Sequence, residues 1–156
     1  MTRVKGFFLR VLPALAAFAL APTLPAQARE VAASCDNASF LAAQSDFENG
    51  GAHGDRAVHI CGRVIAVSPR AHRTRSGVHG YFYVDVGQGV SIRIVSNLDE
   101  MNAPAWPWVH KGDEADVIGR YYYDSPRRQG IDWTHRGTSR KWDVPGSITV
   151  NGNRYE

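Results

Sequence analysis

The stretch that decides the fold runs from Tyr81 to Val95 and reads YFYVDVGQGVSIRIV. Apolar residues occupy every second position on either side of a central Gly-Gln-Gly, which is the period of a strand with one buried face. The two glycines supply the φ freedom that a tight hairpin turn requires. The stretch therefore predicts a β-hairpin, turning at Gly87-Gln88-Gly89, whose inner side chains are Phe82, Val84, Val86, Val90, Ile92 and Ile94.

The remaining side chains of this hairpin point the other way, because successive residues of a strand face opposite sides of the sheet. They are Tyr81, Tyr83, Ser91 and Arg93. The hairpin thus has one face for the core and an aromatic, cationic face that is available to a ligand.

Upstream of the hairpin the pattern predicts one strand and one helix. Residues 57–67 alternate apolar and polar positions, and Gly62 within them indicates a bulge or bend. Residues 37–48 fit a short helix that is capped by Asp36 or Asn37 and ended by the Gly50-Gly51 pair.

Downstream, Pro104 and Pro107 limit residues 97–110 to a short helical turn or an irregular connection. We expect strands over 115–123 and 131–136, and a terminal hairpin over 148–155 that turns at Asn151-Gly152. Tryptophan in a small domain usually covers the ends of the core, so we expect Trp106-Pro107-Trp108 to plug one end and Trp133 to be buried.

This order of elements predicts a mainly β domain. A long strand, a hairpin, an irregular linker and two more strands are the elements of a five-stranded OB-like Greek-key barrel, here with a short N-terminal helix. Another small β-barrel or a sandwich is the alternative, because strand order alone does not determine closure. Residues 29–156 are enough for one such domain and leave no room for a second core.

The first 28 residues have the three parts of a cleavable signal peptide. Arg3, Lys5 and Arg10 precede an apolar run over 11–20, and Ala26-Gln27-Ala28 forms a small-residue cleavage site. A membrane anchor is the alternative, but the run is shorter than the roughly 20 apolar residues that a bilayer requires. A lipoprotein signal ending at Cys35 is a weaker alternative. We therefore expect a periplasmic or secreted protein with no membrane span after cleavage.

Removal of the leader changes the charge balance. The chain has 18 basic and 15 acidic residues, and three of the basic ones lie in the leader. The mature chain then has as many basic as acidic residues, so any anionic partner must be recognised by a local patch.

The only two cysteines, Cys35 and Cys61, both lie after the leader. In an exported chain they have one intramolecular pairing, and we expect a disulfide that stabilises the fold by roughly 3 kcal/mol. Two buried thiols are the alternative. A zinc site made of thiolates is excluded by the count.

Several short motifs of the C-terminal half resemble a known family. Gly112-Asp113, Gly119 to Tyr123, Asp132-Trp133-Thr134-His135 and Asn151 to Tyr155 are similar to the small secreted bacterial proteins filed as domain of unknown function DUF-3465. The similarity covers about Gly54 to the C-terminus and implies an OB-like fold and export.

The same resemblance implies little about the chemistry of a functional site. The family pattern has histidines at the positions of His79 and His135, which this chain keeps, but Asp132 and Ser96 stand where further histidines are expected. A metal site built from several histidines is therefore not expected here.

Two basic loops suggest a ligand-binding surface. The loop after the first strand carries Arg70, His72, Arg73, Arg75 and His79 with no acidic residue, and a second cluster lies between the last two strands and after them. OB-folds bind oligonucleotides and oligosaccharides with these loops and the strand faces between them. The expected ligand-binding residues are Arg70, Arg73, Arg75, His79, Tyr81, Tyr83, Arg93, Arg127, Arg128 and His135.

The first hypothesis is thus an exported binding module for an anionic polymer, such as an oligonucleotide or acidic glycan, or for an acidic protein surface. The second is a histidine-dependent hydrolase of the cell envelope that uses His79 and His135. A structural role with solvated loop charges is a third. The sequence contains no nucleophile elbow, no zinc-protease helix and no phosphate-binding glycine loop, so no cofactor and no metal are expected.

Overall fold

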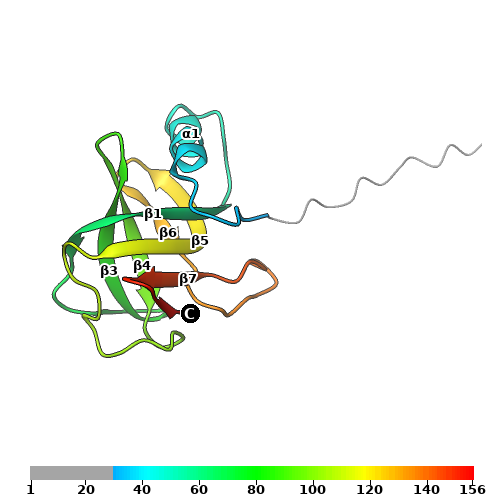
Figure 1. Ribbon diagram of the computed structural model, residues 1–156. Coiled ribbons are helices and arrows are strands. Elements are labelled where there is room, and N and C mark those ends of the chain that lie inside the picture. Colours follow the sequence, from blue (N-terminus) through cyan, green and yellow to red (C-terminus); the bar gives the residue numbers. More distant parts are fainter. Residues whose placement is uncertain (1–29) are drawn as a thin grey trace, which may run out of the picture.

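The computed structural model describes residues 30–156, and the expected signal peptide lies outside them. One helix is followed by eight strands along the described chain, and Figure 1 shows their arrangement. They are α1 (Asn37–Glu48), β1 (Arg56–Val67), β2 (His72–Thr74), β3 (Gly77–Gly87), β4 (Val90–Asn97), β5 (Glu114–Ser125), β6 (Arg128–Asp132), β7 (Ser147–Val150) and β8 (Asn153–Tyr155). The mainly β prediction is confirmed.

Five of the strands form a closed ring. β1 pairs with β3, β3 with β4, β4 with β6, β6 with β5, and β5 returns to β1. The β4–β6 contact is parallel and the others are antiparallel. β2 adds to β3, β7 adds to β5 and β8 adds to β7, outside the ring.

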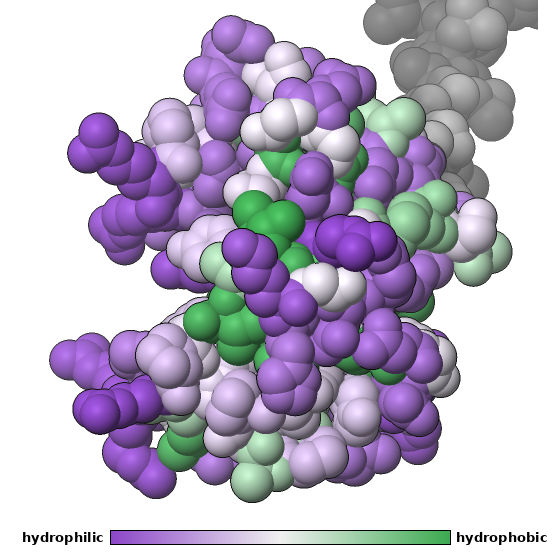
Figure 2. Space-filling model, turned by 60° about the vertical axis from the view of Figure 1, so that its left-hand side comes forward, coloured by the Kyte–Doolittle hydropathy of each residue, from purple (hydrophilic) through white to green (hydrophobic). Residues whose placement is uncertain are grey.

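The interior of the ring is the hydrophobic core. Phe82, Val84, Ile92 and Ile94 are at most 1% exposed, as the alternating pattern predicted, whereas Val90 at the hairpin turn is half-buried. The outer surface is mostly hydrophilic on the side that Figure 2 shows, with apolar side chains gathered at an indentation.

The helix α1 covers one end of the ring, as Figure 1 shows. Asp36 is the N-cap, since its carboxylate accepts hydrogen bonds from the backbone and the hydroxyl of Ser39. Phe40 and Phe47 pack edge-on against Tyr121 of β5. These contacts place the helix against the core with the boundaries predicted.

The predicted disulfide between Cys35 and Cys61 is present and ties the start of α1 to β1. Asn37 strengthens the same junction. Its side-chain amide donates to the carbonyls of Cys61 and Val86 and accepts from the Cys61 backbone N–H. The helix is therefore attached to two strands of the ring by covalent and polar contacts.

The linker between β4 and β5 covers another part of the core, as expected for its tryptophans. Trp108 is 9% exposed and packs edge-on against Phe82. The Trp106 ring lies on Gly80, where an added Cβ would come within 2.3 Å of it, and its indole N–H donates to the Ser68 carbonyl.

Two local predictions were wrong. The short strand β2 was not expected, because its three residues are all exposed and have no apolar alternation. The strand expected over 131–136 instead covers Arg128–Asp132 and ends before Trp133, which has a positive φ of 53°. Trp133 is consequently half-buried and lies outside the core.

Gly62 marks the point where β1 changes partner. β1 pairs with β5 up to Arg63 and with β3 from Arg63 onward. A Cβ on Gly62 would lie 1.8 Å from the carbonyl oxygen of Asp85. Only a residue without a side chain allows the two backbones to approach so closely, so the glycine at this position permits closure. The register irregularity of β1 lies between Val64 and Ala66, close to the bulge or bend that was predicted at Gly62.

We therefore expect Gly62→Ala to lower the free energy of unfolding by about 3 kcal/mol or more, because β1 and β3 must separate to admit the methyl group. Gly51→Ala is the matched control, since its Cβ would meet nothing closer than 3.5 Å. Urea unfolding of both variants measures the effect. Equal stabilities for the two variants would contradict the close approach as the reason for glycine.

Candidate functional site

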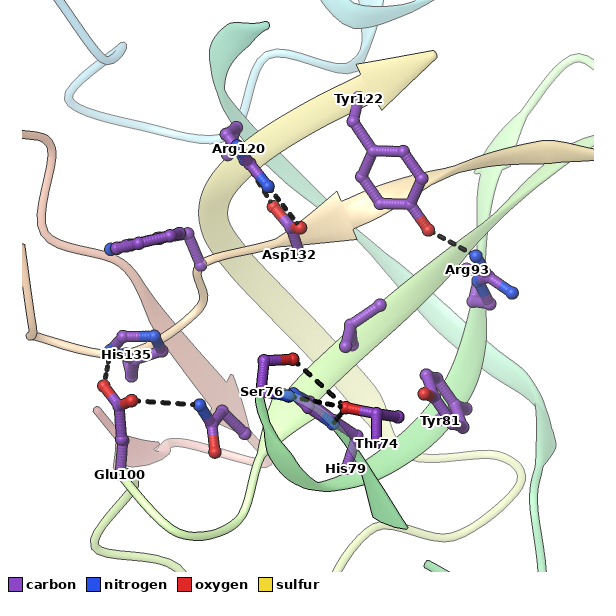
Figure 3. A pocket seen from close by; sticks show the side chains of 13 residues that line it. Thr74, Ser76, His79, Tyr81, Arg93, Glu100, Arg120, Tyr122, Asp132 and His135 are labelled. Carbon is purple, nitrogen blue, oxygen red and sulfur yellow. Dashed lines mark hydrogen bonds and ion pairs between the residues drawn. The ribbon is translucent and has the colours of Figure 1, made fainter. Parts of the chain in front are cut away.

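A polar cavity of about 450 Å³ lies on the outer side of the ring. Its floor consists of side chains that point away from the core on β3, β4, β5 and β6. The β2–β3 turn and the segments after β4 and β6 form its walls. Figure 3 shows the labelled side chains arranged around one central space. The outward positions of the strands, predicted to be available, therefore do form a concave site.

One wall is held by an ion pair between β5 and β6. Arg120 Nε and Nη2 donate to the two carboxylate oxygens of Asp132 at 2.7 Å each, and Nη1 donates to Asp55 at 3.0 Å. These carboxylates raise the pKa of Arg120. The guanidinium also lies over the Trp133 ring, 5.5 Å from its centroid. Its charge is thus compensated within the protein.

Arg93 on β4 is different. Its guanidinium donates to the hydroxyl of Tyr122 and lies 5.6 Å and 6.0 Å from the ring centroids of Tyr81 and Tyr122. Within residues 30–156 no carboxylate lies within ion-pair distance of it, and its buried Nε has no hydrogen-bond partner. The site therefore contains a half-buried cation whose partners are all neutral.

The neutrality of Tyr122 follows from its surroundings. Burial raises the pKa of Tyr122, and the lowering effect of Arg93 is smaller. The phenol keeps its proton at neutral pH, so it offers Arg93 a hydrogen bond and no compensating charge.

Across the cavity, His79 lies beside two hydroxyl groups, as Figure 3 shows. Thr74 Oγ1 is 3.2 Å from His79 Nδ1 and 3.1 Å from Ser76 Oγ. Burial lowers the pKa of His79, while the Gly77 backbone and the carboxylates of Asp99, Asp132 and Glu100 partly oppose the shift. His79 is therefore a neutral imidazole at neutral pH.

His135 lies at the end of the cavity that Glu100 closes. Its Nδ1 is 3.2 Å from Glu100 Oε2 but makes no hydrogen bond with any described residue. The neighbouring Thr134 hydroxyl donates to the Val95 carbonyl of β4 at 2.8 Å, which fixes this segment against the ring. Asn97 donates to Glu100 Oε1 and holds the carboxylate in place.

The predicted ligand residues are only partly brought together. His79, Tyr81, Arg93 and His135 line the cavity. Tyr83 lies on the same outer face and lines a second hollow. Arg70, Arg73 and Arg75 are exposed and belong to the segment around β2, which borders the cavity through Thr74 and Ser76.

The structure does not bring the two basic loops together. Arg73 pairs with Val78 at the start of β3. β6 runs parallel to β4, with Ile131 beside Ile94, so Arg128 lies level with Ser91 near the start of β4. Ser91 in turn pairs with Asp85 near the end of β3. The two loops are therefore about seven residues, or ~23 Å, apart along β3. Arg127 and Arg128 are not part of this site.

The expected ligand-binding residues did not include those that complete the cavity. Arg120, Tyr122 and Asp132 face outward on their strands, and the alternating pattern places them there. Their proximity to Arg93 depends on β6 lying between β4 and β5, which no local pattern specifies. Asn97 is the last residue of β4, and Glu100 and Trp133 lie in the irregular segments that follow β4 and β6.

Within residues 30–156 no group of three or more histidine, cysteine or acidic side chains is arranged to hold a metal ion. Over the same residues no helix has the length and apolarity needed to cross a membrane. The described cavity therefore offers hydrogen bonds, aromatic rings and one uncompensated cation.

Comparisons of the chain with models of protein families, with curated proteins and with solved structures find no match. The function must be argued from the geometry of the cavity.

His79 should make the stability of the protein depend on pH. Its pKa is lower in the folded state than the ordinary value of about 6.5, so the unfolded chain takes up the proton first as the pH falls. Stability is lost below about pH 6.5, and His79→Gln should reduce that loss. Urea unfolding at about pH 8 and at about pH 5 measures it. The same loss in the variant and the wild type would contradict the shift.

Proposed function

We propose that this protein is an exported OB-type binding module whose cavity binds an anionic group of a polymeric ligand at Arg93. The observation that carries the proposal is the charge of Arg93. A half-buried guanidinium normally has an anionic partner, because burial of an uncompensated charge is costly. An anion of the ligand would supply the missing partner.

The order of the strands supports the OB-type assignment. The ring β1-β3-β4-β6-β5 closes through β1, its β4–β6 contact is parallel, and the irregular linker with the tryptophans stands between the third and fourth ring strands. OB-folds are five-stranded Greek-key barrels that use the face of their second and third strands for ligands. In this chain those strands are β3 and β4, which carry Tyr81 and Arg93.

Export is supported by two features. The Cys35–Cys61 disulfide is of a kind that persists in oxidising compartments. The N-terminal 28 residues have the pattern of a signal peptide, and the resemblance to the DUF-3465 family implies the same location. We accordingly propose a periplasmic or secreted protein.

A polymeric ligand is supported by the basic segment beside the cavity. Arg70, Arg73 and Arg75 lie next to the residues that form its rim, and within residues 30–156 none of them has a carboxylate within ion-pair distance. A ligand with several negative charges would meet these arginines after its first charge reached Arg93. An acidic protein surface is less well accommodated, because Arg93 lies inside a cavity.

A histidine-dependent hydrolase is the second candidate. The observation that favours it is the contact between Thr74 Oγ1 and His79 Nδ1, since a neutral histidine beside a hydroxyl is the arrangement that activates a nucleophile. The same hydroxyl is also 3.2 Å from the Ser76 N–H and 3.3 Å from the Gly77 carbonyl. These bonds are those of a turn, and they favour the binding function.

Arg93→Gln should weaken the binding of a short fluorescent oligothymidylate or oligogalacturonate about 10-fold or more, because a hydrogen bond to a charged group contributes about 1.5–3 kcal/mol. Fluorescence anisotropy at low salt measures the affinity. Arg93→Lys should bind with intermediate affinity, since it retains the charge but loses the planar fork.

Arg128→Gln is the matched control, because Arg128 is 76% exposed, stands at the start of β6 and lines neither the cavity nor the hollow beside it. Its affinity should stay within about twofold of the wild type, as expected for an exposed charge. If neither probe binds the wild type, or if the two variants bind equally well, the proposed function is wrong. Thermal unfolding of each variant checks that the fold is retained.

The double variant His79→Gln/His135→Gln separates the two candidates. The binding function predicts that it keeps most of the affinity for the anionic probe, and that the wild type does not hydrolyse a chromogenic ester or phosphodiester above the buffer rate. Hydrolysis by the wild type that disappears in the double variant would establish the hydrolase instead.

A further inference from the structure

We infer that the polymer is a single-stranded oligonucleotide, with a phosphate at Arg93 and a base stacked in a second hollow beside the cavity. This inference rests on the proposed function and identifies the class of its ligand. The chemistry of the second hollow supports it. An anion site at Arg93 alone would not require such a hollow.

The second hollow, here called the stacking hollow, has a volume of about 410 Å³ and shares Tyr81 and Arg93 with the cavity. Its other walls come from Ala66 to Ser68, His72 and Tyr83. Because both hollows open on the same arginine, a ligand whose anionic group reaches Arg93 can extend into each of them. A polymeric ligand with a negative charge at Arg93 and a ring group in a neighbouring hollow fits this arrangement.

The stacking hollow is rich in rings. Tyr83 is 40% exposed and stands directly opposite Arg93 in the register of β3 and β4. Tyr81 and Tyr83 are two residues apart on one strand, so their side chains lie on the same face about 7 Å apart. The His72 ring is 5.4 Å from the Tyr81 ring. Exposed rings beside an arginine are the features that bind unpaired bases.

The same hollow is poorly suited to a sugar. No carboxylate or amide side chain of the described residues lines it. The Ser68 hydroxyl and His72 Nε2 lie 3.2 Å apart and partner each other, which leaves the Tyr81 and Tyr83 hydroxyls and the Arg93 guanidinium as the other polar side-chain groups of the hollow. These are few partners for the several hydroxyl groups of a sugar ring, whereas a base can bind mainly by flat contact with the aromatic rings.

Part of the segment that carries the exposed arginines around β2 lies beside the stacking hollow. The Ser68 hydroxyl donates to the carbonyl of Arg70, which places Arg70 beside the stacking hollow. His72 and Thr74 of β2 line the stacking hollow and the cavity respectively, so the Arg73 side chain between them faces the other side of this strand. A further phosphate of a strand that crosses Arg93 would therefore come near Arg70. This gives a second cation beside the rings of the stacking hollow.

The test compares a short oligothymidylate with an abasic oligomer of equal length, which has the same phosphates and no bases. The wild type should bind the oligothymidylate more tightly. Tyr83→Ala should weaken that binding about 5- to 150-fold, since stacking contributes about 1–3 kcal/mol per base. It should leave the affinity for the abasic oligomer and the salt dependence unchanged.

Two variants serve as controls. Ile65→Ala removes the other large exposed apolar side chain, which is 38% exposed and lines neither hollow, and it should change neither affinity. Tyr83→Phe keeps the ring and should bind oligothymidylate within about twofold of the wild type.

Equal affinity for the two oligomers, equal losses on both in Tyr83→Ala, or tighter binding of oligogalacturonate would overturn the inference. In each of these results binding still depends on Arg93, so the proposed function stands. Failure of the wild type to bind any of the anionic probes overturns both.

Discussion

Strand β1 pairs first with β5 and then with β3, and the ring closes because its backbone can approach that of Asp85 at Gly62. The absence of a side chain at this one position allows the two strands to come together without a gap. The closed interior then takes up the alternating apolar residues of all five strands, so that nearly every large core side chain is fully buried. The helix and the tryptophan-bearing linker cover what the ring leaves open. Closure also has a consequence outside the core, because it curves β3, β4, β6 and β5 into a single surface.

The candidate site is the outer face of that surface. Each strand contributes residues at its outward positions, and the ring brings Arg93, Tyr122, Arg120 and Asp132 together although they come from three strands. Within this group the charges are unequally matched. Asp132 and Asp55 compensate Arg120, so Arg120 holds the wall together, whereas Arg93 has only neutral partners and is the group that a ligand can satisfy. The same arginine lines both the polar cavity and the stacking hollow, so the proposed anion site has a different environment on each side.

The alternating pattern was sufficient for much of the architecture. It predicted the helix, the hairpin of β3 and β4, and the inner and outer faces, because each depends on neighbours a few residues away. It failed for β2, because β2 is a strand through its pairing with β3 and its own side chains show no alternation. It also failed for the end of β6, where Trp133 takes a left-handed backbone conformation. For the site it identified four of the lining residues, all of which carry polar or charged groups in or next to strongly patterned segments. It also grouped Arg127 and Arg128 with them, and register excludes this.

Local order along the chain was enough to determine the period of the long strands, the disulfide pairing and the outward direction of Tyr81, Tyr83 and Arg93. It also limited the helix cap to Asp36 or Asn37. The tertiary structure alone decided which outward side chains share a cavity. That depends on the parallel placement of β6 beside β4. The two segments in contact are about 37 residues apart in the sequence, so closure of the ring brings them together and no local preference specifies the contact. The unmatched charge of Arg93 was decided at the same level. A guanidinium is free or compensated according to what lies across the sheet from it. Residues 29–156 contain as many acidic as basic residues, and the sequence does not specify which of them meet.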